Sequence, residues 1–332
     1  MGVVRSLARA TKLGGSATDV SLPINGMSGP VYAHTIQILS QLKQARIDLE
    51  AAGAAAMTLA PAIRAIRRTE VRLRRPLRVA IVGEFNSGKS SLANLLARIE
   101  SLPTAAVSST RIPTLLYQAQ EPELWAVRCD GTRQLLRADH PVSGEPIFRL
   151  DVGLPSARLR GVQFLDLPGL ADPKSKASLA DLPLHHVDGV LWCTVSVQAW
   201  KESERRAWEQ IPARLRDRGL LVATHCDLLR STIEKMRLLS RLRVEAGPSF
   251  SGIVLISNTR ALAAIRGEHE GSAADIWETS GADTLDMLLD EMLQNVRKHR
   301  NEAALEITRR IADHTLARLD RGCPRWIPGA PP

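Results

Sequence analysis

Eight consecutive residues, Gly83 to Ser90, have the types and spacing of a loop that binds phosphate groups. They read G-E-F-N-S-G-K-S and fit the pattern G-x-x-x-x-G-K-[ST]. Glycines let backbone N–H groups close around an anion, and the helix that follows points the positive end of its dipole at the same place. In such a loop Lys89 reaches the β- and γ-phosphates, and the hydroxyl of Ser90 is a ligand of Mg²⁺. The predicted phosphate contacts are Gly83, Asn86, Ser87, Gly88, Lys89, Ser90 and Ser91.

A carboxylate and a glycine lie three residues apart further along the chain, at Asp166 and Gly169. The pattern D-x-x-G is short, and it gains weight here because a predicted strand over residues 161–165 precedes it. At a strand end the carboxylate can hold Mg²⁺ through water, and the backbone N–H of the glycine can sense a γ-phosphate. We therefore expect Asp166 to help Ser90 hold the metal and Gly169 to contact phosphate.

The segment Thr224-His225-Cys226-Asp227 follows a predicted strand and stands where [NT]-K-x-D reads a nucleotide base. A carboxylate accepts two hydrogen bonds, and guanine offers N1–H and its exocyclic amino group as a matching pair. Adenine offers no such pair, so Asp227 predicts a preference for guanine. His225 replaces the usual lysine, whose stem packs along the base, and an imidazole can also stack there. The alternative is that Asp227 only caps the next helix.

A second base contact is expected from Ser257 and Asn258, which follow a predicted strand over residues 253–256. A short loop at this position can approach the carbonyl group of guanine. The intervals between Asp166, Asp227 and Ser257 each have room for one helix, one strand and their turns. All the motifs therefore stand at carboxyl ends of strands, where open α/β sheets bind their ligands.

The elements that position these residues are short, apolar, β-branched runs separated by polar, helix-compatible stretches. The runs cover residues 77–82, 161–165, 189–195, 219–223 and 253–256. Continuous apolar runs of this length are typical of strands buried on both faces, and their alternation with helices predicts a mostly parallel sheet. The expected fold class is α/β, a P-loop NTPase of three layers, α/β/α.

Helical seams flank this core on both sides. Apolar residues recur in steps of three and four from Ile38 to Ile66, with Pro61 expected to kink or split that helix. A second seam contains Leu285, Leu289, Met292 and Val296. We expect these helices to pack together in a small bundle beside the core. The predicted division is a flexible lead over 1–30, a helical segment over 31–75, the core over 76–280, a helix over 281–320 and a loose tail over 321–332.

The composition narrows the class of protein and of partner. Hydrophobic residues make up 44%, aromatic residues 4%, and the formal net charge is +9. This charge favours anionic partners, although solvated arginine-rich helix faces explain it as well. Four scattered cysteines have no spacing of a metal site or disulfide framework, which favours a reducing, cytoplasmic setting. No apolar run is long enough to span a membrane.

Taken together, the motifs resemble the GTPase domain of the dynamin superfamily, in particular that of bacterial dynamin-like proteins. The resemblance covers about residues 77–260. The strings that carry it are Gly83–Leu96 (G-E-F-N-S-G-K-S-S-L-A-N-L-L), Leu102-Pro103-Thr104, Ser109–Thr114 (S-T-R-I-P-T), Asp166–Leu170 (D-L-P-G-L) and Thr224–Asp227 (T-H-C-D).

The resemblance implies a Mg²⁺-dependent enzyme that hydrolyses GTP to GDP and phosphate and dimerises through its nucleotide face. It implies that Thr110, with Ser109 as the second choice, closes onto Mg²⁺ and the γ-phosphate. The catalytic residues are then Lys89, Ser90 and Thr110, and the metal ligands Ser90, Thr110 and Asp166. Two positions depart from related proteins: Phe85 stands where dynamins carry glutamine, and Leu170 where Ras-like proteins do. Slow hydrolysis is one consequence.

Two other functions fit the same motifs. The first is a nucleotide-dependent switch or scaffold with negligible hydrolysis, consistent with the missing glutamine. The second is an Era-like GTPase that acts on RNA, suggested by the basic charge. No RNA-binding module follows the core and the basic residues lack interleaved aromatics, so we expect no nucleic-acid partner. Arginines near 64–78 and 297–310 instead suggest peripheral, electrostatic contact of a cytoplasmic protein with an anionic membrane.

Overall fold

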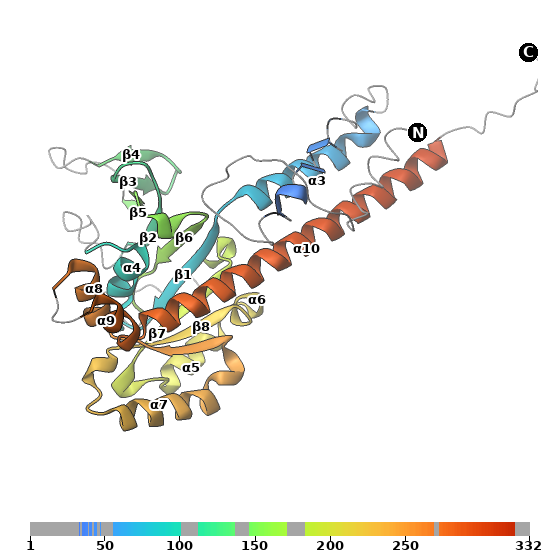
Figure 1. Ribbon diagram of the computed structural model, residues 1–332. Coiled ribbons are helices and arrows are strands. Elements are labelled where there is room, and N and C mark those ends of the chain that lie inside the picture. Colours follow the sequence, from blue (N-terminus) through green and yellow to red (C-terminus); the bar gives the residue numbers. More distant parts are fainter. Residues whose placement is uncertain are drawn as a thin grey trace, which may run out of the picture. The chain divides into compact units, whose positions relative to one another are not determined.

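The computed structural model describes parts of residues 33–47 and residues 56–100, 112–136, 146–170, 183–268 and 272–322 (Figure 1). The predicted lead over residues 1–30, nearly all of the predicted tail and the threonine Thr110 with its neighbour Ser109 lie outside this part of the chain. Two compact units are present. One comprises residues 76–296, and the other comprises residues 1–75 together with 297–332.

The larger unit is built on a nine-stranded sheet in the order β4-β3-β5-β2-β6-β1-β7-β8-β9. The strands are β1 (Leu77–Gly83), β2 (Thr114–Gln118), β3 (Glu123–Arg128), β4 (Arg133–Leu135), β5 (Ile147–Leu154), β6 (Val162–Asp166), β7 (Gly189–Val195), β8 (Gly219–Thr224) and β9 (Gly252–Leu255). From β6 to β9 all neighbours are parallel, whereas β2 is antiparallel to β6 and β3 is antiparallel to β4 and β5. The mostly parallel α/β sheet is therefore confirmed.

Four strands, β2 to β5, were not expected from the sequence. The predicted strands were continuous apolar runs, and such runs require burial on both faces, as in β1. Strands β3 and β4 lie at one end of the sheet and mix buried with exposed positions. Their short, mixed sequences do not stand out as apolar runs, because much of their stabilisation comes from pairing with neighbouring strands.

Helices cover both faces of the sheet. Val79 and Ile81 of β1 face one apolar core, and Ala80 and Val82 face the other. The first core is closed by α4 (Lys89–Ala97), α8 (Asn258–Arg266) and the start of α10 (Ala282–Gly322), with α9 (Ala273–Thr279) beside them. The second core is closed by α5 (Glu202–Glu209), α6 (Ala213–Arg216) and α7 (Thr232–Glu245). Short 3₁₀ turns connect elements: η3 (Ala157–Leu159), η5 (Leu184–His186), η6 (Ser196–Gln198), η7 (Cys226–Leu228) and η8 (Gly247–Ser249).

The seam at the start of α10 has a different partner from the one expected. Leu285, Leu289, Met292 and Val296 all belong to the first core of the sheet. This part of the helix therefore covers the sheet, and the larger unit extends to residue 296 instead of 280. An apolar stripe shows that a helix face is buried, but it does not show whether a sheet or another helix buries it.

The smaller unit contains α3 (Ala56–Arg74) and the later part of α10 from residue 297. Within it, Thr35 Oγ1 donates a hydrogen bond to Asn301 Oδ1 at 3.0 Å, and Arg300 donates to the carbonyl oxygen of Arg75 at 3.1 Å. α3 continues through Pro61. No helix in the described part of the chain is long and apolar enough to cross a membrane.

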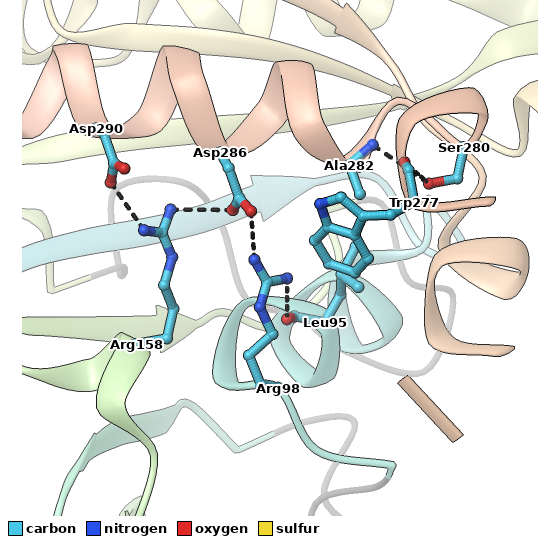
Figure 2. A network of polar contacts seen from close by, with 8 residues as sticks. All are labelled: Leu95, Arg98, Arg158, Trp277, Ser280, Ala282, Asp286 and Asp290. Atoms are coloured by element: carbon cyan, nitrogen blue, oxygen red, sulfur yellow. Dashed lines mark hydrogen bonds and ion pairs between the residues drawn. The ribbon is translucent and has the colours of Figure 1, made fainter. Parts of the chain in front are cut away.

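An ion-pair cluster joins α4 and η3 to α10 inside the larger unit (Figure 2). Arg158 contacts Asp286 Oδ1 at 3.0 Å and Asp290 Oδ1 at 2.9 Å. Arg98, which ends α4, forms an ion pair with the other oxygen of Asp286. The Arg98 guanidinium also lies 4.1 Å from the ring centre of Trp277. Asp286 thus forms ion pairs with two arginines, whereas Asp290 forms an ion pair with one.

We expect the substitution Asp286→Ala to lower the free energy of unfolding by about 2 kcal/mol, because it leaves two partly buried arginines without their shared carboxylate. The matched control is Asp290→Ala on the same helix. Its side chain is half exposed, so its loss should cost less than about 1 kcal/mol. Urea denaturation of both variants measures the difference. Equal costs would show that the cluster does not act as described.

Candidate functional site

The phosphate loop connects β1 to α4 and has the backbone that its glycines permit. A Cβ atom on Gly83 would lie 2.3 Å from the carbonyl oxygen of Cys193 in β7, so no side chain fits there. Asn86 and Gly88 have positive φ angles of 58° and 78°. Gly88 is the N-cap residue of α4. The loop therefore curls at the start of this helix, as the sequence predicted.

Lys89 lies inside this curl. Its side chain is buried, its Nζ donates to the carbonyl oxygen of Glu84 at 2.6 Å, and Ser87 Oγ is 3.5 Å away. A Cβ atom on Gly169 would lie 3.3 Å from the same Nζ. The ammonium group therefore stands between the phosphate loop and the D-x-x-G segment, where a phosphate chain would enter.

Ser90 and Asp166 meet as expected for two groups that share a metal. Ser90 Oγ donates to Asp166 Oδ2 at 3.0 Å. The other oxygen, Oδ1, is buried and has no hydrogen-bond partner among the described residues. Burial raises the pKa of Asp166 to about 6, although the Ser90 hydrogen bond and Lys89 oppose the shift.

This donor set fits Mg²⁺. A hydroxyl, a carboxylate and an unpartnered carboxylate oxygen are ligands that this ion accepts, and it commonly completes its shell with waters and substrate phosphates. Among the described residues no group of three or more His, Cys, Asp or Glu side chains could hold a metal alone. A metal at Ser90 and Asp166 would take further ligands such as waters and substrate phosphates.

The D-x-x-G segment is docked directly on the phosphate loop. Phe85 N–H donates to the Leu170 carbonyl oxygen at 3.0 Å, and Leu170 N–H donates to that of Gly83 at 3.0 Å. A Cβ atom on Gly169 would lie 2.8 Å from the Cα of Phe85, so only glycine fits. Phe85 is exposed and Leu170 is buried. Neither side chain offers a polar group for orienting a water molecule.

The first base-reading segment is fastened to the phosphate loop by a buried hydroxyl. Thr224 Oγ1 lies 2.9 Å from the carbonyl oxygen of Ser87 and 3.1 Å from that of Thr194. His225 has a positive φ angle of 57°. Its Cε1 is 3.1 Å from the point that a Cβ atom on Gly88 would occupy. The histidine ring therefore lies against the phosphate loop.

Asp227 is available to a ligand. Its side chain is exposed, and it stands in the short turn η7. The alternative that it caps the following helix is wrong, because Ser231 has that role: its Oγ accepts a hydrogen bond from Glu234 N–H at 3.2 Å.

The two residues of the second predicted base segment, Ser257 and Asn258, make different contacts. Ser257 Oγ accepts a hydrogen bond from Arg260 N–H at 3.3 Å and so caps α8. Asn258 Nδ2 donates to the Gly88 carbonyl oxygen at 3.1 Å. Asn258 Oδ1 is buried without a hydrogen-bond partner in the part of the chain that the structure describes. The Ser257 side chain thus serves the fold, and Asn258 is the one of the two that contacts the phosphate loop.

Sequence reasoning missed a cluster around the second residue of the loop. Lys201 Nζ contacts Glu84 Oε2 at 2.7 Å, and Ser203 Oγ donates to Glu84 Oε1 at 2.6 Å. Burial raises the pKa of Glu84, but these two hydrogen bonds and the nearby lysines outweigh it and hold the pKa below its usual value. No motif contains Lys201 or Ser203, since they reach the loop only because β7 pairs with β1.

The raised pKa of Asp166 predicts a pH-dependent penalty on stability. The folded-state pKa of about 6 exceeds the ordinary value near 3.9, so the charged carboxylate opposes folding above about pH 6. This cost decreases as the pH falls from about 6 to about 4, because the carboxyl group becomes protonated. Without nucleotide, Asp166→Asn should therefore raise the free energy of unfolding at pH 8, by at most about 3 kcal/mol. Near pH 4 the gain should vanish. A variant that is no more stable than the wild type at pH 8 would contradict this account of the site.

Comparison with known proteins finds similarity to the dynamin family over part of the chain. Residues 79–143 match the family model described as "Dynamin family". The chain is 30% identical over 136 residues to "Dynamin-like protein 2" of Campylobacter jejuni, which is 39% of this chain and 22% of that protein. It is 30% identical over 129 residues to "Isoniazid-induced protein IniC" of Mycobacterium tuberculosis, 35% of this chain and 26% of that protein. These matches span about a quarter of the length of both relatives.

Solved structures agree at the level of the fold. A structure of an oligomerised bacterial dynamin pair covers 73% of this chain, and the match includes 39% of that chain, with a TM-score of 0.52 and 20% identity. The bacterial dynamin GTPase LeoA from ETEC covers 87% of this chain, and the match includes 49% of that chain, with a TM-score of 0.50 and 14% identity. The expected P-loop α/β/α fold and the resemblance to the dynamin superfamily are confirmed.

Proposed function

We propose that this chain, which is similar to proteins of the dynamin family, binds GTP and GDP with Mg²⁺ and hydrolyses GTP to GDP and phosphate. One observation carries the proposal: the groups that would bind phosphate, metal and base converge on one edge of the sheet. Lys89, Asp166 and Asp227 come from three separate strand ends, and hydrogen bonds join the loops that hold them.

The phosphate and metal subsites follow from this arrangement. Backbone N–H groups at the start of α4 and the ammonium of Lys89 bind the phosphate chain. Ser90 and Asp166 hold Mg²⁺, with Thr110 as the further ligand that the family resemblance implies. When bound, the ion neutralises charge on the phosphates. A bound cation would favour the charged form of Asp166 and so lower its pKa.

The base subsite supports a preference for guanine. Asp227 is exposed and lies three residues after the end of β8 at Thr224, so its carboxylate can accept both hydrogen bonds from guanine. His225 supplies the flat group beside the base, and the amide of Asn258 lies close to it at Gly88. Ser257 contributes through its backbone position at the start of α8, since its side chain caps that helix.

Hydrolysis has to proceed without a glutamine at the two usual positions. Phe85 is exposed on the nucleotide face and can contact a second copy of the chain, whose groups could complete the site. We therefore propose that dimerisation across this face accelerates an otherwise slow reaction. One similar structure is that of an oligomerised bacterial dynamin pair with a role in the long-range sensing and tethering of membranes. Peripheral contact of this chain with an anionic membrane through its basic helices belongs to the same proposal.

The nucleotide-dependent switch with negligible hydrolysis is the second candidate, and the missing glutamine favours it. Phosphate release measured over a range of protein concentrations separates the two functions. A dimerising enzyme gives a specific activity that rises with concentration, whereas a switch releases almost no phosphate at any concentration. The Era-like alternative is a weaker fit, since the family model that matches is the dynamin one.

Isothermal titration should detect GTP and GDP binding and much weaker ATP binding, because Asp227 pairs with donors that adenine lacks. The variant Asp227→Asn should bind GTP about 100-fold more weakly, since two hydrogen bonds to a charged group are lost. It should gain affinity for xanthosine triphosphate, whose base presents an oxygen in place of the amino group. ATP binding as tight as GTP binding would refute the base assignment.

Replacing Lys89 by alanine should abolish nucleotide binding and phosphate release while leaving the circular-dichroism spectrum unchanged. The residue contacts the loop's own carbonyl oxygen and contributes little to either apolar core. The control is Lys298→Ala, which removes an exposed lysine outside the larger unit. Normal GTP affinity in Lys89→Ala would show that the phosphate loop is wrongly assigned.

A further inference from the structure

His225 occupies the position that a permanently charged lysine takes in the related motif, and an imidazole ring can be either neutral or charged. Its Nδ1 lies 2.9 Å from Thr224 Oγ1. The same oxygen is 2.9 Å from the Ser87 carbonyl oxygen and 3.1 Å from the Thr194 carbonyl oxygen. The buried Thr224 hydroxyl therefore has three polar neighbours, and only one of them can receive its proton.

The three distances determine which nitrogen of the ring carries the proton. Carbonyl oxygens can only accept, so the Thr224 hydroxyl has to donate to Ser87 or Thr194. If it donated to His225 Nδ1 instead, two carbonyl oxygens would face its lone pairs without a hydrogen between them. Nδ1 is then the donor to Thr224 Oγ1. The neutral ring is held as the Nδ1–H tautomer, and Nε2 is its one site for a further proton.

The place of the ring puts that second proton next to the phosphate loop. The carbon between the two nitrogens, Cε1, is 3.1 Å from the point that a Cβ atom on Gly88 would occupy, and Asn258 Nδ2 is 3.3 Å from the same point. Asn258 Oδ1 is buried and has no hydrogen-bond partner among the described residues. The ring carbon that is bonded to Nε2 thus lies at the phosphate loop, close to the amide group of Asn258.

The charges around the ring come from several elements. Lys89 stands at the start of α4, and Asp227 lies two residues further along the same loop. Lys235 of α7 and Arg260 of α8 act electrostatically on the neighbouring Cys226. The residue of β7 that lies near the ring, Thr194, carries no charge. A bound nucleotide brings several negative charges to the phosphate loop on which the ring lies, so binding favours a proton on the ring.

We propose that His225 couples nucleotide binding to proton uptake: Thr224 holds the ring as the Nδ1–H tautomer, and Nε2 takes a second proton when a guanine nucleotide binds. The inference rests on the proposed function and adds a property to the same site. The added proton gives the imidazole the charge that a lysine would carry permanently. Protonation keeps the Thr224 hydrogen bond, since Nδ1 is a donor in both forms. Guanine nucleotides should therefore bind more tightly as the pH falls.

The tautomer is tested first, on the nucleotide-free protein, by ¹⁵N NMR of the histidine rings at about pH 8. The expected result for His225 is a protonated Nδ1 and an unprotonated Nε2. Thr224→Val removes the hydroxyl and should produce a mixture of tautomers, whereas Thr224→Ser should keep the Nδ1–H form. A wild-type ring protonated at Nε2 would overturn the proposal, even if Thr224→Val failed to fold.

Proton uptake is tested by titrating GDP without Mg²⁺ into the wild type and His225→Lys between about pH 8 and pH 5.5. Titration of the nucleotide phosphate and of Asp166 affects both proteins, so the ratio of the two affinities isolates the ring. This ratio should rise about three- to tenfold in favour of the wild type as the pH falls. His299→Lys, a histidine replacement outside the larger unit, should follow the wild type.

The outcomes separate this inference from the function on which it rests. GDP binding with the same pH profile in wild type and His225→Lys would overturn the inference and leave the proposed function intact. Absence of guanine-nucleotide binding at every pH would overturn both. Tight GDP binding whose pH dependence disappears in His225→Lys, together with the Nδ1–H tautomer in the free protein, is the result that supports it.

Discussion

The close approach of the phosphate loop to the ends of the neighbouring strands is the constraint on which the site depends. At Gly83 the chain passes so near to the Cys193 carbonyl oxygen that no side chain fits. On the other side the Thr224 hydroxyl holds the Ser87 carbonyl oxygen. The loop is thus tied to β7 and β8 before any ligand arrives. Because all these strands are parallel, their carboxyl ends meet at one edge, and the groups that they carry converge there.

The site is prepared at some cost in stability. Burial raises the pKa of Asp166 to about 6, and Lys89 is buried with a carbonyl oxygen of its own loop as a neighbour. Such groups are typical of sites that await a ligand of complementary charge. The surrounding fold compensates through its two apolar cores and through the ion pairs of Asp286. These pairs fasten the end of α4 to α10, so the helix that begins at the phosphate loop is anchored at both ends.

Sequence reasoning was strongest where local chemistry leaves few choices. The phosphate loop has residues with positive φ angles and a buried lysine in the order that the motif requires, and its place after an apolar strand was evident from the run over residues 77–82. Five strands were recognised because burial on both faces demands continuous apolar sequence. Strands β2 to β5 were not, because pairing with neighbours, and not an apolar run, makes their residues strands. The seam of α10 was recognised as buried, but its partner was wrongly expected to be another helix.

The sequence by itself determined that a phosphate loop and two carboxylates, one predicted to bind metal and one predicted to read a base, follow strands of one sheet. Only the tertiary structure decided what each neighbouring side chain does. Ser231, and not Asp227, caps α7, and Ser257 caps α8. Lys201 reaches Glu84 from a distant part of the chain. The physical reason is that strand order brings these residues together. Motif spacing along the chain does not show which hydroxyl group lies beside which carbonyl oxygen. In this protein such contacts of the Thr224 hydroxyl determine which ring nitrogen of His225 carries the proton.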